Sequence, residues 1–137
     1  MWLRCLADLI FPRKCEICGR LLTGDERYIC DDCMEDMPLT YYWDWPENPA
    51  EKKLWVRTHL HRVIPLFFYT RESRYITLIH KIKYQGKIHL GHHMGSLLGE
   101  KIKMALPDVD YIVPVPLHPL RKWRRGYNQA EVIARGV

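Results

Sequence analysis

The sequence predicts an α/β protein in two parts, a small zinc-binding module followed by part of an α/β domain. Four cysteines form two Cys-x-x-Cys pairs within the first 40 residues. After residue 61, β-rich apolar runs alternate with segments whose apolar residues recur at helical spacing, a pattern typical of α/β domains. We therefore expect a zinc module with an N-terminal amphipathic helix at residues 1–40, an aromatic and proline-rich linker at 41–61, and a partial α/β domain at 62–137.

The paired cysteines define the first module. Two residues between cysteines let both thiolates turn toward one ion, and two such pairs supply the four sulfur ligands of a tetrahedral zinc site. The predicted metal ligands are Cys15, Cys18, Cys30 and Cys33. A redox role is the main alternative, but a thioredoxin-like site needs a single pair beside a strand–helix unit. A closed four-sulfur site leaves no open position for substrate, so we expect the zinc to be structural.

The remaining cysteine, Cys5, has no partner at this spacing and is expected to be a small buried apolar residue. Between the pairs, residues 23–26 have the composition of a turn. The aromatic side chains of residues 38–49 either pack onto a neighbouring module or stack on bases, and packing is favoured because each ring buries a large area. Residues 48–61 are expected to form a short helix or an ordered loop.

The partial domain is expected to contain two strands and three helices. The strands are predicted at residues 63–69 and 111–115, and the helices at 73–84, at 90–104 and from Asn128 onward. Gly91, Gly95 and Gly99 recur every fourth residue, which predicts a narrow strip where the second helix packs tightly against a sheet.

Basic residues are concentrated in the C-terminal two thirds of a chain whose net charge is +5. Residues 1–40 hold five basic and eight acidic side chains, whereas residues 111–137 hold five and one. This balance fits a phosphate-bearing partner, whether nucleotide, sugar diphosphate or nucleic acid, although a solvated basic surface is the commoner explanation of a charge excess. No stretch approaches the roughly 20 apolar residues of a membrane span, and the apolar start lacks a cleavage site, so we expect a cytoplasmic protein.

A basic loop follows the strand at 111–115, where an α/β sheet holds its ligands. Arginine binds phosphate in bidentate fashion, and glycine lets the backbone approach a ligand closely. The candidate phosphate- or nucleic-acid-binding residues are Arg121, Lys122, Arg124, Arg125, Gly126 and Asn128. An exposed cationic loop without ligand remains the alternative. The histidines His89, His92 and His93 also cluster, but a pair one helical turn apart fills only half of a coordination sphere, so packing or surface roles are favoured.

Several motifs follow one another along the whole chain. The double Cys-x-x-Cys module is followed by the aromatic linker and by Ile-His-Lys-Ile-Lys-Tyr-Gln-Gly at 79–86. Next come Val-Pro-Val-Pro-Leu-His-Pro at 113–119 and Arg-Arg-Gly-Tyr-Asn-Gln-Ala-Glu at 124–131. In this order, the motifs resemble the ComF family of competence-associated proteins, which are similar to phosphoribosyltransferases.

The resemblance implies a zinc module on a type I phosphoribosyltransferase-like α/β domain that is associated with the uptake or processing of transforming DNA. It implies that residues 116–126 contact a diphosphate, through Arg121, Arg124 and Arg125. Family members continue into an acidic strand and a Thr-rich ribose-phosphate cradle, whereas this chain stops at Val137. We therefore expect a shortened form that is inactive alone and would bind magnesium and phosphoribosyl diphosphate only with the missing C-terminal part.

Three functions stay open, and no catalytic residue is identified. The chain is the first part of a ComF-like transferase homologue, a nucleic-acid-binding accessory module for single-stranded DNA, or a docking module whose acidic residues 1–40 recruit DNA-uptake proteins. In each case an oligomer or the missing half is expected to cover the exposed edge of the predicted sheet.

Overall fold

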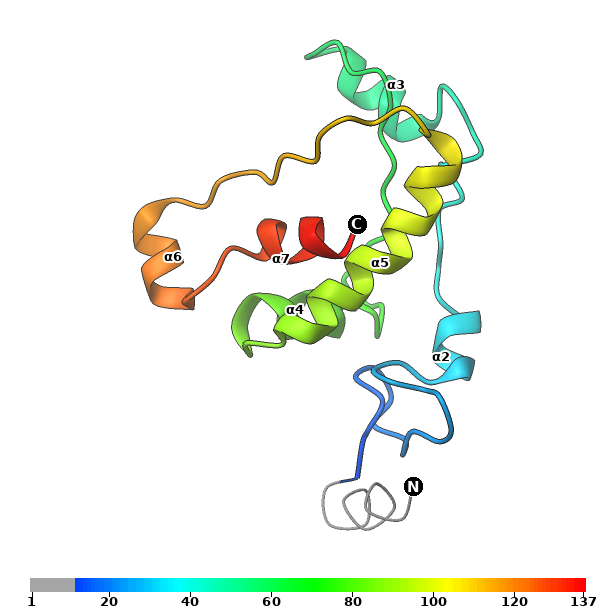
Figure 1. Cartoon of the computed structure of the whole chain (residues 1–137). Helices are drawn as coiled ribbons and strands as arrows, with labels where there is room; N and C mark the ends of the chain where they lie inside the picture. Colours follow the sequence, from blue (N-terminus) through cyan, green and yellow to red (C-terminus); the bar gives the residue numbers. More distant parts are fainter. Residues whose placement is uncertain (1–11) are drawn as a thin grey trace.

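The computed structural model describes residues 12–137, which form short helices joined by long loops around one long helix (Figure 1). The described helices are α2 (Asp31–Glu35), α3 (Pro49–Trp55), α4 (Ile76–Tyr84), α5 (Ile88–Ala105), α6 (Pro119–Arg125) and α7 (Gln129–Gly136). The predicted N-terminal helix and Cys5 lie outside the described residues. Within residues 12–137, no helix has both the length and the apolar character needed to cross a membrane.

The two predicted strands do not form a sheet in the described part of the chain, so the α/β class is not confirmed. Residues 63–69 contribute a single antiparallel bridge, between Leu39 and Phe67. Residues 109–115 run as an irregular segment with mostly exposed side chains. A strand needs a neighbour to pair its backbone, and β propensity describes how well side chains fit such a sheet rather than a tendency of the isolated segment. That another chain or further strands cover residues 109–115 stays a prediction.

The glycine strip packs against a helix, which corrects the predicted contact with a sheet. A Cβ on Gly91 would lie 2.9 Å from Cγ1 of Val132 in α7, and one on Gly95 would collide with the carbonyl oxygen of Ile133. At Gly99, a Cβ would lie 2.6 Å from the carbonyl oxygen of Val137. The missing side chains therefore let α7 lie directly on the backbone of α5.

Residues 119–125, predicted as part of a loop, form the helix α6. Its first residue is Pro119, and the side chain of His118 accepts a hydrogen bond from the backbone N–H of Leu120. Gly126 ends the helix with a left-handed backbone (φ 80°). Proline at the first position and glycine just beyond the last are ordinary helix boundary signals, which the sequence contains.

Helix α7 begins at its predicted cap. The side-chain oxygen of Asn128 accepts a hydrogen bond from the backbone N–H of Ala130 at 3.1 Å. Its amide nitrogen donates to the carbonyl of Val115 at 3.0 Å. Asn128 therefore both caps α7 and ties the irregular segment 109–115 to that helix.

The linker at 41–61 is ordered around a buried carboxylate. Glu51 in α3 is fully buried and accepts hydrogen bonds from Arg62 Nε at 3.0 Å and from the backbone N–H of Val63 at 3.1 Å. Arg62 in turn donates to the carbonyl oxygens of Tyr42 and Trp43. Because the side chains of Tyr42 and Trp43 are also buried, the packing role predicted for the linker aromatics is confirmed for these two.

Candidate functional site

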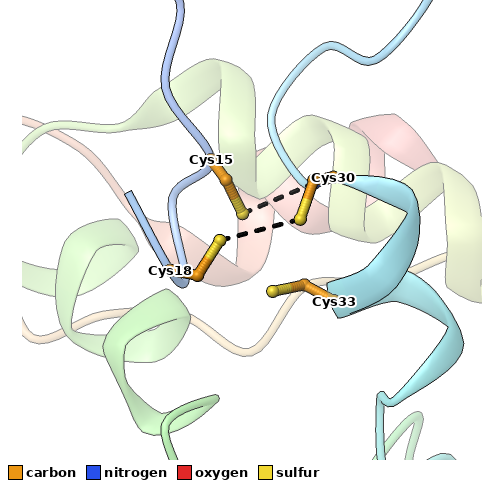
Figure 2. Close-up of side chains that lie close together, drawn as sticks. All are labelled: Cys15, Cys18, Cys30 and Cys33. Atoms are coloured by element: carbon orange, nitrogen blue, oxygen red, sulfur yellow. Dashed lines mark hydrogen bonds between the residues drawn. The ribbon is translucent and has the colours of Figure 1, made fainter. Parts of the chain in front are cut away.

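The four cysteines predicted as metal ligands come together at one point. Figure 2 shows their side chains converging on a common centre, and the four sulfur atoms lie within 4.8 Å of one another. The sulfur atoms of Cys18 and Cys30 are 3.7 Å apart, too far for a disulfide. In a tetrahedral zinc site with Zn–S bonds of about 2.3 Å, neighbouring sulfurs are about 3.8 Å apart. The donor set and the spacing therefore fit zinc, and with four protein ligands the site is structural.

Short backbone turns place the first pair of ligands. The backbone N–H of Gly19 donates to the carbonyl of Cys15 at 2.9 Å, and Gly19 has a left-handed backbone (φ 77°) that favours glycine. A bridge between Lys14 and Leu21 closes this loop from outside. The tight knuckle thus follows from the glycine directly after Cys18.

The second pair flanks the start of α2. Cys30 is the N-cap of this helix and Cys33 lies within it, so one turn of helix aims both thiols at the centre. The predicted turn at residues 23–26 joins the two pairs, because the backbone N–H of Glu26 donates to the carbonyl of Thr23 at 3.1 Å.

Backbone donors prepare the site for thiolates. Burial alone would raise the pKa of Cys15, but N–H groups of Cys18, Cys30 and Ile17 outweigh it and lower that pKa to about 6. Burial raises the pKa of Cys33, and the neighbouring cysteine side chains raise it further. A bound metal cation stabilises four clustered thiolates. Metal binding therefore releases the protons of the thiols and completes the fold of the module.

A basic pocket of about 270 Å³ lies between the C-terminal end of α4 and α6. Three of the predicted phosphate-binding residues, Arg121, Arg124 and Arg125, line it together with Lys83. Two tyrosines complete the lining, Tyr84 and Tyr127, along with Gly86. The structure therefore brings together side chains from two segments that lie more than 30 residues apart in the sequence.

The other three predicted residues do not line this pocket. Lys122, Gly126 and Asn128 line a second hollow, which is shared with His89 and His92. The side chain of Asn128 is already used to cap α7 and to bind Val115, so its part in the site is to fix the chain after α6.

Sequence reasoning missed Lys83, Tyr84 and Tyr127 as pocket residues. The guanidinium of Arg125 lies over the ring of Tyr84, 5.1 Å from the ring centroid, which is a cation–π contact. The signal was present as Lys-Tyr-Gln-Gly at the end of the predicted helix 73–84, but only the fold shows that it meets α6.

The three clustered histidines do not share one site, because His89 and His92 line the second hollow whereas His93 does not. His93 packs against the ring of Tyr28, with ring centroids 5.3 Å apart. Burial lowers the pKa of His93, and the nearby charge of Arg27 lowers it further. Within residues 12–137, the cysteine cluster is the only group of side chains arranged to hold a metal ion.

Comparison with known proteins supports the predicted zinc module. A double zinc ribbon domain matches residues 6–42, a segment that contains all four ligands. DNA utilization protein YhgH from Salmonella typhi is 27% identical over 126 residues, covering 88% of this chain and 52% of the relative. The corresponding protein from Salmonella typhimurium is 26% identical over the same length. Competence protein F from Haemophilus influenzae is 35% identical over 65 residues, covering 42% of this chain and 28% of the relative.

These relatives and the zinc ribbon support the ComF assignment that the sequence motifs suggested. The four ligands lie inside the matched ribbon and converge in the structure, which supports a structural zinc site. The chain spans about half the length, or less, of the relatives it matches. No solved structure matches it significantly, so the phosphoribosyltransferase-like fold implied by the family resemblance is not confirmed.

Proposed function

We propose that this ComF-family chain is a zinc-stabilised, phosphate-binding part of a DNA-handling protein, and that its ligand is single-stranded nucleic acid. The observation that carries the proposal is the basic pocket between α4 and α6. Four cationic side chains line it, and within residues 12–137 none of them forms an ion pair with a carboxylate. They are Lys83, Arg121, Arg124 and Arg125.

Cations gathered in this way repel one another, and a phosphate group relieves that repulsion. Arginine offers a planar fork of N–H donors that matches two phosphate oxygens, which makes three arginines in one pocket well suited to a phosphate backbone. Elsewhere in the described chain, basic residues such as Arg62 and Lys81 do pair with carboxylates. Other basic residues among those described, such as Lys52 and Arg57, also form no ion pair, so what distinguishes the pocket is that four cations gather in one place.

Aromatic side chains favour nucleic acid over an isolated phosphate ion. Trp123 in α6 is 85% exposed, and Tyr84 on the pocket lining is exposed as well. Base stacking on such rings contributes about 1–3 kcal/mol per base and tolerates any sequence. The names of the relatives refer to competence and DNA utilization, which supports DNA as the nucleic acid.

A second candidate is the diphosphate of phosphoribosyl diphosphate. It is favoured by the family resemblance of residues 113–131, in which the same arginines would contact the diphosphate.

Fluorescence anisotropy of a labelled oligothymidylate, titrated with the zinc-loaded chain, tests the proposal. We expect binding that the double substitution R124A/R125A weakens strongly and that W123A weakens to a smaller extent. Competition by phosphoribosyl diphosphate at low concentration, with W123A unchanged, would favour the second candidate. Oligonucleotide affinity that R124A/R125A leaves unchanged would exclude the pocket as the site.

A further inference from the structure

Helix α4 bonds to both halves of the zinc module and also lines the basic pocket. We propose that α4 couples the two sites, so that zinc binding holds Lys83 and Tyr84 in place for the phosphate ligand. This inference rests on the proposed function, and it assigns Glu16 and Tyr75 as positioning residues that act through α4. Figure 1 shows α4 between the N-terminal loops of the zinc module and α6.

The first link runs from Glu16, which lies between the first two zinc ligands, to α4. Lys81 donates from its Nζ to the carboxylate of Glu16 at 2.9 Å and to the backbone carbonyl of Glu16 at 2.8 Å. Lys87, just after α4, donates to the other carboxylate oxygen at 3.0 Å. The side chain of Glu16 is only 14% exposed.

The second link joins the other pair of ligands to the start of α4. The hydroxyl of the buried Tyr75 donates to the backbone carbonyl of Cys33 at 3.0 Å. Next to it, Arg74 forms an ion pair with Asp36 at 2.8 Å. No side chain caps the N-terminus of α4, so these contacts are what fix this end of the helix.

At its other end, α4 meets the pocket. The hydroxyl of Tyr127 donates to the backbone carbonyl of Ile82. Lys83 and Tyr84 follow directly and face Arg125 and the other cations of α6. A movement of α4 relative to the zinc module would therefore move two pocket residues and the carbonyl that Tyr127 binds.

The coupling follows from the size of the helix. Nine residues are too few to form a stable isolated helix in water, so the position of α4 depends on what it packs against. Its buried residues Leu78 and Ile82 belong to the same core cluster as the zinc ligands Cys15, Cys30 and Cys33. If zinc stabilises the placement of α4 that binds the phosphate ligand, the bound ligand must raise the affinity for zinc by the same factor by which zinc raises the affinity for the ligand.

The charge-neutral substitution Tyr75→Phe is the sharpest test, because it removes the hydroxyl that donates to Cys33 and accepts from Arg74, and it changes neither a sulfur ligand nor a pocket residue. We expect the zinc-loaded variant to keep its metal and to bind labelled oligothymidylate about three- to fivefold more weakly. The matched control is Tyr111→Phe, whose ring is 86% exposed and which should bind like the wild type. Unchanged affinity in Tyr75→Phe overturns the coupling.

The substitution Glu16→Gln separates positioning from simple electrostatics. It removes a negative charge and frees two lysines, so long-range attraction alone predicts tighter oligonucleotide binding. The coupling predicts weaker binding, because the glutamine amide presents N–H groups to one of the lysines. Metal analysis of the same samples must show full zinc content, and tighter binding by a zinc-loaded variant contradicts the proposal.

Hydrogen exchange decides the coupling even if the proposed function fails. In Tyr75→Phe with zinc bound, we expect faster exchange in residues 80–87 and 119–127 than in the wild type. A wild type that does not bind oligonucleotide refutes the proposed function alone. Exchange in residues 119–127 that is identical in the two proteins refutes the coupling.

Discussion

Salt dependence gives a quantitative test of the basic pocket. Four cations line it, so at most four phosphate contacts form there. For a single strand, the logarithm of affinity falls with the logarithm of salt concentration with a slope of about −0.7 per contact, or roughly −2.8 for four contacts. A fourfold rise in salt should then weaken binding by roughly 50-fold.

The double substitution R124A/R125A leaves two contacts. Its slope should be roughly −1.4, and the same rise in salt should weaken binding only about sevenfold. Anisotropy titrations of labelled oligothymidylate over a series of salt concentrations measure both slopes. The matched control, R57A/R71A, changes two exposed arginines that do not line the pocket, and it should keep the wild-type slope. Equal slopes for wild type and R124A/R125A would refute this reasoning.

Two further predictions concern the framework around the sites. Substitution of Glu51 by Gln leaves Arg62 without its buried partner and should lower the free energy of unfolding, measured in urea, by about 2–3 kcal/mol. Burial opposes ionisation of Glu51, but the N–H of Val63 and the guanidinium of Arg62 lower its pKa. The ionised carboxylate therefore stabilises the folded protein fully above the ordinary carboxyl pKa, and this stabilisation is lost as pH falls through the lowered pKa. The difference in unfolding free energy between E51Q and wild type should then shrink in acid. A difference that stays constant with pH would contradict this prediction. The substitution Gly95→Ala forces a methyl group into the carbonyl of Ile133 and should cost about 1–3 kcal/mol, whereas an unchanged midpoint would mean that α5 and α7 are not in backbone contact.

The zinc ligands and several helices could be predicted from sequence because local rules determine them. The spacing of Cys15, Cys18, Cys30 and Cys33 identifies one metal site without reference to the rest of the fold. The predicted helices at 73–84 and 90–104 correspond to α4 and α5, and the cap at Asn128 starts α7.

The failures concern contacts between distant segments. The β-rich residues 111–115 find no pairing strand among residues 12–137, so the strand predicted there from propensity is not confirmed. The glycine strip identified close packing but not its partner, because a helix and a sheet both accept a surface without side chains. The charged residues after Pro119 favour a loop, but the proline and glycine boundary signals at Pro119 and Gly126 mark the helix that forms there.

The pocket, too, could be predicted from sequence only in part. Arg121, Arg124 and Arg125 were identifiable from their own segment, since a run of arginines beside glycine is visible in any sequence. Lys83 and Tyr84 join them only through the placement of α4, which no local pattern encodes.

The central claim is that the four cysteines hold a structural zinc ion, and metal analysis of the purified chain tests it most directly. We predict one zinc ion per chain, lost in Cys33→Ser together with the cooperative unfolding transition, because the ligands belong to the core that continues into α4 and α5. A purified chain without zinc, or a Cys33→Ser variant with unchanged zinc content and unfolding midpoint, would contradict the assignment of these cysteines to a structural zinc site.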